Sequence, residues 1–478
     1  MHPLDVLLPA AVAVVAAASF GAARRRRALR MPLPGRMGTR SEGAAVALAV
    51  LASAAVAQVL LTGWRWQLVP AAAAAGPIVL VLLARVAGRR PRLDMAAAVL
   101  ATTGAVLALA LSWALPVRVM PIPDGPHAVG TTTFVVRDEA RAERYGPEPG
   151  GPRELVVQVW YPAAPDAPVV RAPLVPQAAA FVELGAAELG LPRFALGHLP
   201  LIRGNATEDA AVLPGRAPVV LLAHGWTGFR TVQSDLAERL ASEGYVVAAA
   251  DHRYGALVTT FPDGRADVFD PEALPEFGTV PADEYARASR ALITTFADDL
   301  ALVLRSLEER PPSALAGSLD LTRVAMVGHS TGGGAAFQSC AAEPRCAAAA
   351  GLDPWVEPVD EDVLRTGIGR PMLSLRTADW IARPNEAVLR ELHRTQRDRG
   401  VPETLVRIDG ALHRDFTLIG ALSPVGRLLG IAGETPDRAT RAATAEWTVR
   451  FLDHHVRGIG TDPADEPPAG VAVPEVGP

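Results

Sequence analysis

The sequence predicts an α/β domain with a mostly parallel sheet, preceded by an all-α domain of about four helices. Two observations predict this division. Residues 1–116 contain four long apolar stretches, whereas residues 129–457 contain several short apolar runs typical of buried strands. One of these runs leads directly into a glycine-rich turn around Ser330 and then into a helical segment, which is an order of elements found in α/β sheets.

The four apolar stretches are each about long enough to cross a bilayer. They lie near 6–22, 44–61, 68–86 and 95–115, and we expect four transmembrane helices there. Because alanine makes each stretch only weakly hydrophobic, a buried helical bundle is the alternative. A cleaved signal peptide is disfavoured, since no Lys or Arg precedes the first stretch and four arginines follow it at 24–27.

The arginines between the stretches predict the orientation in the membrane. Seven lie between the first and second stretches and four lie at or between the third and fourth, whereas only Arg65 lies between the second and third. Arginine-rich loops stay in the cytoplasm, so the loop with Trp64 and Trp66 is expected outside. The sequence therefore predicts a multi-pass protein of the cell membrane with its α/β domain on the extracytoplasmic side, even if the first stretch does not insert.

Charge is divided in the same way. Residues 1–116 carry 12 arginines and three acidic residues, a net charge of +9, so the remaining residues carry −14 of the total of −5. An acidic outer domain argues against a nucleic-acid partner. The expected partners are the bilayer and a small-molecule substrate, and the sequence does not indicate an oligomeric state.

Proline marks the boundaries of the α/β domain. Four prolines between positions 116 and 126 predict an extended linker over 117–128. Residues 129–457 can bury one large core, in which strands at 132–136 and 155–160 begin the sheet and 285–307 forms an amphipathic helix. The tail 458–478 is rich in proline and acidic residues and is expected to be disordered.

A glycine turn follows the buried strand expected at 217–223. It reads His224-Gly225-Trp226-Thr227-Gly228, and a backbone N–H in such a turn can face a reaction centre. We expect the N–H groups of Trp226 and Thr331 to form an oxyanion hole, with His224 orienting the turn.

The turn around Ser330 has the pattern Gly-His-Ser-Thr-Gly over 328–332 and follows the apolar run 324–327. A strand, a sharp turn and a helix in this order present the nucleophilic serine of an α/β-hydrolase fold. Glycine is needed at both ends because the serine adopts strained backbone angles and neighbouring side chains have no room. Since the short pattern can arise by chance, the residues around it must support the assignment of Ser330 as the nucleophile.

A histidine and two aspartates complete the predicted site in the chain order that this fold uses. His413 follows a strand expected at 405–408 and is the predicted general base. Asp353 follows the first strand after the Ser330 helix, and Asp379 follows the next strand. Either aspartate can orient the imidazole, whereas Asp415 is too near His413 in sequence.

Taken together, these segments resemble the platelet-activating-factor acetylhydrolase family of the isoform II type, which are serine esterases. The family has an acid in a Leu-Asp-x-Trp stretch and a His-x-x-Phe stretch at the base, and both patterns occur here around Asp353 and His413. The resemblance therefore implies Asp353 as the acid, with Asp379 as the alternative. The multi-span membrane domain departs from the well-known members. The matching segments are 219–253, 328–333, 351–358 and 410–416.

The resemblance implies hydrolysis of an acyl ester through an acyl-enzyme, with no metal or organic cofactor. The expected substrate is a lipid-derived ester with a short acyl chain. A lipase, a polyesterase and a dienelactone-type hydrolase are alternatives. A noncatalytic binding domain on a membrane scaffold is an alternative of another class.

Three further features allow two interpretations each. Cys340 and Cys346 can form a disulfide in an extracytoplasmic compartment, or they are two buried thiols. The apolar stretch 178–201 forms a cap or a lipid-facing surface, or it packs in the core. The pair His454 and His455 in the terminal helix is more typical of a surface than of a metal site.

Overall fold

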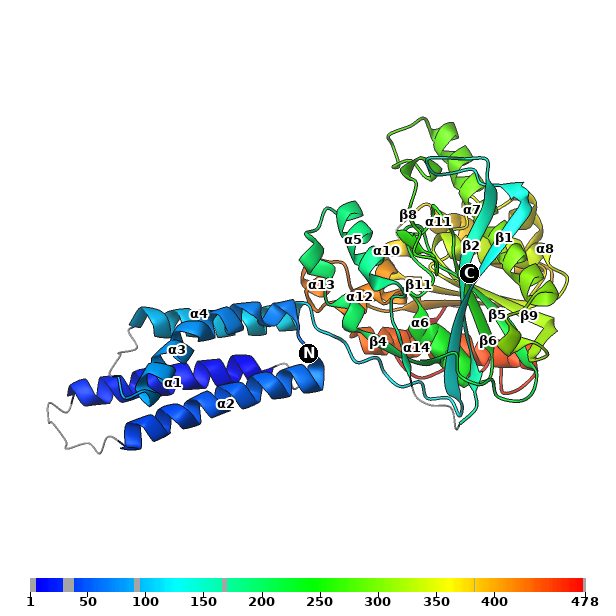
Figure 1. Cartoon of the computed structure of the whole chain (residues 1–478). Coiled ribbons are helices and arrows are strands. Elements are labelled where there is room, and N and C mark those ends of the chain that lie inside the picture. The colour runs from blue at the N-terminus through cyan, green and yellow to red at the C-terminus, as the bar shows by residue number, and fades with distance from the viewer. Residues whose placement is uncertain (1–5, 29–37, 90–94, 166–169, 382, 476–478) are drawn as a thin grey trace. The chain divides into compact units, whose positions relative to one another are not determined.

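The computed structural model describes residues 6–28, 38–89, 95–165, 170–381 and 383–475 (Figure 1). The chain divides into two compact units. One comprises Met1–Val119 with Leu422–Pro424, and the other comprises Met120–Ala421 with Val425–Pro478.

The first unit is helical, as the apolar stretches predict. Small residues allow two of its helices to approach closely, because a Cβ added at Gly104 would lie 2.5 Å from the carbonyl oxygen of Pro70. Ala101, Ala105 and Ala108 are fully buried on the same helix as Gly104. The helices are α1 (Leu7–Ala28), α2 (Gly38–Thr62), α3 (Val69–Val86) and α4 (Met95–Ala114), with the 3₁₀ turn η2 (Trp66–Leu68).

The expectation of four membrane spans is wrong. Within the described residues, three helices are long and apolar enough to cross a membrane, namely Ser41–Leu61, Trp66–Val86 and Ala96–Ala114. Within the described side chains, the first stretch provides only the shorter apolar helix Leu7–Ala18, which is below the length of about 20 residues needed to cross a bilayer. Apolar side chains on the three longer helices, including Leu60, Leu80 and Val106, are exposed.

The second unit contains a mixed, mostly parallel sheet of eleven strands in the order β13-β12-β11-β10-β9-β5-β6-β2-β1-β4-β3. The six strands from β12 to β6 in this order are parallel, whereas β2 is antiparallel to both β6 and β1. The strands expected at 132–136 and 155–160 lie within β1 and β2. The strands are β1 (Ala128–Ala142), β2 (Pro152–Ala163), β3 (Arg171–Pro173), β4 (Arg203–Glu208), β5 (Ala217–Ala223), β6 (Val246–Asp251), β9 (Leu319–His329), β10 (Cys346–Leu352), β11 (Met372–Thr377), β12 (Glu403–Ile408) and β13 (Ala472–Pro474), and β7 (Val258–Thr260) with β8 (Ala266–Val268) forms a separate pair.

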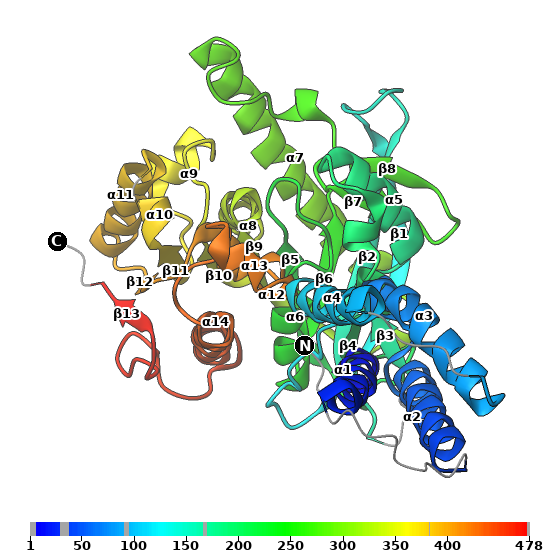
Figure 2. The same ribbon diagram turned by 90° about the vertical axis from the view of Figure 1, so that its left-hand side faces the viewer.

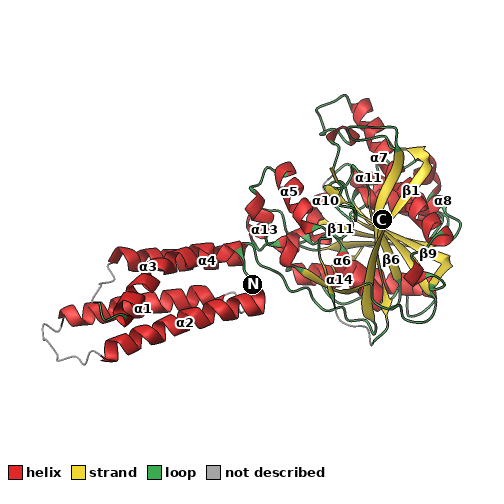
Figure 3. Cartoon of the chain, in the orientation of Figure 1, coloured by secondary structure: helices red, strands yellow, loops and turns green. Residues whose placement is uncertain are grey.

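Helices cover both faces of this sheet, with α6 and α14 on one side and α7, α8 and α11 on the other (Figures 2 and 3). The helix expected at 285–307 is confirmed as the central part of α7. The longer helices are α6 (Ser234–Ser242), α7 (Ala282–Glu309), α8 (Thr331–Ala342), α11 (Asn385–Asp398) and α14 (Asp437–Leu452). Shorter helices and turns are α5 (Ala178–Glu188), η3 (Arg193–Leu196), η4 (Leu199–Leu201), η5 (Pro271–Ala273), η6 (Ser313–Leu315), α9 (Glu361–Thr366), α10 (Ala378–Ile381), η7 (His413–Phe416), α12 (Ile419–Leu422), α13 (Val425–Leu428) and the π-helical η8 (Asp453–Arg457).

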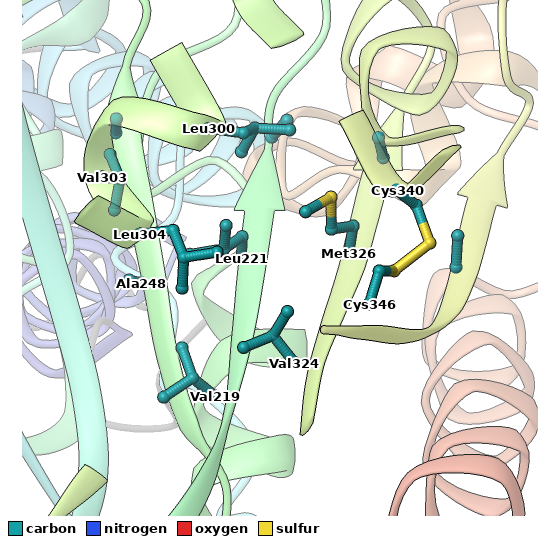
Figure 4. Packing of buried hydrophobic residues seen from close by; sticks show 14 of the residues in the cluster. Val219, Leu221, Ala248, Leu300, Val303, Leu304, Val324, Met326, Cys340 and Cys346 are labelled. Carbon is teal, nitrogen blue, oxygen red and sulfur yellow. A yellow bond between two sulfur atoms is a disulfide. The ribbon is translucent and has the colours of Figure 1, made fainter. Parts of the chain in front are cut away.

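Alternate side chains of the central strands enter two hydrophobic clusters, one on each face of the sheet. Val219 and Leu221 of β5 pack with residues of α7 such as Leu300 (Figure 4). Their neighbours Val220 and Leu222 belong to the cluster that includes residues of α6 and α14. Because both faces are buried, the strands are apolar throughout, which is why they could be predicted from sequence.

Cys340 and Cys346 form a disulfide that joins the end of α8 to the first residue of β10 (Figure 4). Both side chains are buried and belong to the hydrophobic cluster that includes residues of α7. It therefore fixes the helix that follows Ser330 to the strand that precedes Asp353.

The segment after α14 differs from the expected disordered tail, because part of it returns to the sheet as β13. This strand pairs antiparallel with β12, and the Asp409 N–H donates to the Val471 carbonyl oxygen at 3.1 Å. Glu475, just beyond β13, forms an ion pair with the fully buried Arg376. A buried arginine needs an acidic partner, and Glu475 provides one, which is a physical reason for this segment to stay at the sheet.

Candidate active site

Ser330 occupies a strained turn between β9 and α8. Its φ of 54° and ψ of −120° lie outside the conformations that non-glycine residues usually adopt. Glycine is required on both sides, since a Cβ would lie 2.1 Å from the Gly332 oxygen if added at Gly328, and 2.4 Å from the Ala223 oxygen if added at Gly332. The turn therefore holds the serine side chain at the carboxyl end of β9.

The end of β10 and the loop that follows it hold the backbone of Ser330. Its N–H donates to the Leu352 carbonyl at 3.0 Å, and its carbonyl accepts the N–H of Trp355 at 2.9 Å. A Cβ added at Gly225 would lie 2.9 Å from the Ser330 Cβ, so the glycine turn after β5 passes directly beside the serine. The carboxyl ends of parallel strands, where ligands bind in open α/β sheets, thus meet at Ser330.

The imidazole of His413 is paired with Asp353. Its Nδ1–H donates to Asp353 Oδ2 at 3.0 Å, and Asp353 is fully buried after β10 with a φ of +45°. The N–H of Thr377 donates to the other oxygen, Oδ1, at 2.8 Å, and the Thr377 hydroxyl contacts Oδ2. The carboxylate is therefore fixed with one oxygen toward the ring.

Asp379 takes a different position. Its Oδ1 accepts the backbone N–H of His413 at 3.0 Å and lies 2.8 Å from the Thr377 hydroxyl. Of the two aspartates that the sequence left open, Asp353 contacts the imidazole and Asp379 contacts the backbone of the same residue. Both carboxylates position His413, in different ways.

Two aromatic rings enclose the imidazole. Trp380 stacks on His413 with ring centroids 4.0 Å apart and an interplanar angle of 7°. The ring of His329 lies 4.4 Å from it, and His329 Nε2–H donates to the His413 carbonyl at 3.0 Å. Sequence reasoning missed Trp380 and Thr377, although both stand beside Asp379 at the end of a predicted strand.

Burial acts against charge on both members of the His413–Asp353 pair. It lowers the pKa of His413 to about 4, against the opposing effect of Asp379. It raises the pKa of Asp353 to about 7, against the hydrogen bonds from Thr377. Above neutral pH the imidazole is therefore uncharged and the carboxylate ionised, which is the state needed for a general base.

The turn after β5 presents a fixed backbone N–H. The Gly225 carbonyl accepts the Gly228 N–H at 2.8 Å and the Nδ1–H of His224 at 2.7 Å, and the His252 N–H donates to His224 Nε2 at 3.1 Å. These bonds fix the peptide unit whose N–H belongs to Trp226. Neither that N–H nor the Thr331 N–H donates to an acceptor within the described residues.

A cluster of buried charged residues contacts His252, which holds this turn through His224. His252 Nδ1–H donates to Asp299 Oδ2 at 3.0 Å, and its ring stacks on Phe296. Arg153 pairs with Asp299 at 2.6 Å and with Glu143 at 2.8 Å. Burial alone would raise the pKa of Asp299, but Arg153 and His252 hold it well below its usual range. The ionised Asp299 thus holds the ring of His252 in place. The backbone N–H of His252 in turn holds the ring of His224.

The sheet order and the serine turn are those of the α/β-hydrolases. A solved structure supports this class: the ferulic acid esterase from Streptomyces cinnamoneus superimposes with a TM-score of 0.60 and 25% sequence identity, over 74% of this chain and 97% of its own. The family can be stated more narrowly. The model of the family "platelet-activating factor acetylhydrolase, isoform II" matches residues 117–274 and 308–462, so the chain belongs to this family, whose members are carboxylic ester hydrolases.

Two curated relatives named platelet-activating factor acetylhydrolase show how low the sequence identity to this family's members is. The protein from Gallus gallus is 25% identical over 372 residues, which cover 70% of this chain and 83% of the relative. The protein from Cavia porcellus is 25% identical over 256 residues, which cover 50% of this chain and 57% of the relative. The fold and family expected from the sequence motifs are confirmed, and the family match begins after the helical unit.

Proposed function

We propose that the protein is a membrane-anchored serine ester hydrolase with Ser330, His413 and Asp353 as its catalytic triad. The observation that carries the proposal is the 3.0 Å hydrogen bond between His413 and the buried Asp353, on loops that end at the same sheet edge as the strained Ser330. Because Nδ1 of His413 is engaged by the aspartate, Nε2 is the nitrogen left to take a proton.

The proposed reaction has two steps. Ser330 Oγ attacks the ester carbonyl carbon while His413 takes its proton, and the resulting oxyanion accepts the N–H groups of Trp226 and Thr331. His413 then protonates the departing alcohol, which leaves an acyl-enzyme. Water, deprotonated by His413, attacks the acyl carbonyl, and the released proton returns to Ser330 as the acid leaves.

A lipid-derived ester with a short acyl chain is the proposed substrate. The relatives named platelet-activating factor acetylhydrolase support the acetyl ester. The stretch after α5 supports delivery from a lipid surface, since Leu189, Leu191 and Phe194 are between 43% and 56% exposed. The preceding helix α5 is anchored in the core through Phe181, whose ring lies 4.8 Å from that of Phe229. The helix thus packs in the core, while the stretch after it presents exposed apolar side chains that suit contact with lipid.

The three apolar helices support membrane anchoring. Their exposed apolar side chains suit lipid contact, and the distribution of arginines around them favours an extracytoplasmic α/β domain. The disulfide between Cys340 and Cys346 fits an oxidising compartment.

A second candidate substrate class is an ester of an aromatic acid, which the structural similarity to the ferulic acid esterase favours. Both candidates use the same triad, so they differ only in the acyl group and the alcohol. The assay below separates them.

The test uses the full chain purified in detergent, beside the matched variant Ser330→Ala. We expect hydrolysis of p-nitrophenyl acetate and of a phospholipid with an acetyl group at the second position. Activity should fall steeply as the acyl chain lengthens and should be low with feruloyl esters. Preference for long chains indicates a lipase, and preference for feruloyl esters indicates the second candidate. No hydrolysis of any ester, or equal activity of Ser330→Ala, contradicts the proposed triad.

A further inference from the structure

A group of metal-ligating side chains lies where α14 ends. A ring nitrogen of His454, a ring nitrogen of His455 and a carboxylate oxygen of Asp462 all lie within 4.8 Å of one another. No other group of three or more such residues with this spacing was found in the part of the chain that the structure describes.

The backbone brings these residues together by an unusual turn. The last turn after α14 is π-helical over Asp453–Arg457, and Gly458 then reverses the chain with a φ of +70°. In an ordinary α-helix adjacent side chains diverge, whereas here the His454 and His455 rings lie 4.8 Å apart at an angle of 86°. Single π-helical turns recur at functional sites.

His455 is the member that points most clearly to a ligand. Its side chain is 8% exposed, and its Nε2 is buried with no hydrogen bond to any described residue. The nearest carboxylate oxygen is Asp462 Oδ2 at 3.2 Å, a contact that lacks hydrogen-bond geometry. A buried ring nitrogen facing a carboxylate without a hydrogen bond is therefore available to bind a cation.

The carboxylate is oriented for the same purpose. Oδ1 of Asp462 accepts the Ala464 N–H at 2.9 Å, which leaves Oδ2 facing His455. Two ligands at roughly 2.1 Å from a tetrahedral zinc ion are about 3.4 Å apart, close to the distance found between these two atoms. His454 Nδ1 lies 3.2 Å from the Gly460 carbonyl, so the reversed chain also contacts the second ring.

We propose that His454, His455 and Asp462 bind a borderline divalent cation such as Zn²⁺. Two imidazoles and one carboxylate are ligands that suit zinc, and water would complete the coordination. The ion would bind the C-terminal segment, through Asp462, to the two histidines at the end of α14. That segment continues into β13, which pairs with the strand preceding His413.

The proposed cation site is separate from the proposed ester hydrolysis site. Arg323 donates to the Val456 carbonyl at 2.9 Å, which places η8 against the first half of β9, whereas Ser330 follows the last residue of that strand. Metal binding and esterase activity are therefore expected to fail independently.

The test uses the full chain without a polyhistidine tag, stripped with EDTA and titrated with ZnCl₂. Bound zinc is measured by mass spectrometry after equilibrium dialysis, and thermal unfolding is followed in parallel. Asp462→Asn removes the ligand charge and keeps an oxygen for the Ala464 N–H, and His455→Gln removes the buried ring. Asp465→Asn, an exposed acid of the same turn, is the matched control.

We expect one zinc ion per chain and a higher unfolding midpoint with zinc for the wild type and Asp465→Asn. Asp462→Asn and His455→Gln should weaken binding by at least about tenfold and lose the rise in midpoint. Unfolding midpoints measured in EDTA show whether the variants are folded. As a readout that needs no variant, Co²⁺ added to the wild type should give the visible absorption of a four-coordinate site. Zinc binding that is absent from the wild type, or equal in the wild type and both folded ligand variants, overturns the proposal.

Discussion

Trp380 lies flat against the imidazole of His413, with ring centroids 4.0 Å apart and an interplanar angle of 7°. The guanidinium carbon of Arg383 also lies over the indole of Trp380, 5.0 Å from the ring centroid. The tryptophan is thus held in place and limits the rotation of the proposed base. We expect this contact to set the orientation in which His413 meets the serine proton.

Replacing Trp380 should therefore slow the chemical step. Trp380→Ala is expected to lower kcat on the order of tenfold or more with little change in KM, because a misplaced base costs rate rather than substrate binding. Trp380→Phe keeps a flat ring and should recover most of the activity. Steady-state kinetics with p-nitrophenyl acetate provide the measurement, and equal activity of the Ala and Phe variants would contradict a positioning role.

The two aspartates should respond differently to the same substitution. Asp353→Asn removes the charge beside the imidazole and is expected to lower kcat by roughly 10⁴, the loss known for this change in a Ser-His-Asp triad. Asp379→Asn keeps an oxygen that accepts the His413 N–H, so its effect should stay within about tenfold. If Asp379→Asn is the more damaging change, Asp353 is not the acid.

The pH dependence gives an independent reading of the same pair. In the wild type, kcat/KM should rise as the pH passes about 7, because the proton on the pair must be lost before Asp353 is ionised and His413 can act as base. In Asp353→Asn only the imidazole remains, and burial lowers its pKa to about 4. The acidic limb of the variant should therefore move to lower pH. A limb that stays near 7 would show that another group controls it.

His224 should act on the transition state without touching the substrate. Its Nδ1–H bond to the Gly225 carbonyl holds the peptide that carries the Trp226 N–H. His224→Ala should lower kcat by about tenfold or more and leave the pH profile in place, since loss of a whole oxyanion donor costs about 3 kcal/mol. His224→Asn offers an N–H at a similar position and should recover part of the rate. Equal rates for both variants would argue against this role.

The disulfide should contribute to stability rather than to catalysis. Cys340 and Cys346 are six residues apart, and closing so short a loop is worth about 2 kcal/mol by the chain-entropy estimate. The double variant Cys340→Ala/Cys346→Ala is expected to unfold at lower denaturant concentration while kcat changes little. An unchanged unfolding midpoint would mean that the bond adds no stability.

Local sequence patterns identified much of the candidate site. The glycines around Ser330 are required by contacts within a few residues, and apolar strands buried on both faces stand out from the rest of the chain. Asp353 and Asp379 could be placed at adjacent strand ends for the same reason. The aspartate that faces the imidazole is determined by the backbone conformation of Asp353 and by its hydrogen bonds to Thr377. Local motifs do not reveal these features, so only the resemblance to the family implied Asp353.

Features that depend on distant segments could not be predicted. Trp380 stacks on His413 across a loop, and the tail is ordered partly because Glu475 meets a buried arginine. The number of apolar helices long enough to cross a membrane was overestimated, since the described part of the first stretch provides only the shorter helix Leu7–Ala18. The grouping of His454 and His455 with Asp462 could not be predicted, because the sequence does not reveal the π-helical turn or the return of Asp462.

The reactivity of Ser330 tests the proposed triad most directly. The full chain is treated with a fluorophosphonate, and the adduct is located by mass spectrometry in the wild type, Ser330→Ala and His413→Ala. We expect one adduct per wild-type chain on the peptide that contains Ser330, and none on either variant. Labelling of a different serine, or undiminished labelling of Ser330 in His413→Ala, would contradict the assignment of the nucleophile and its base.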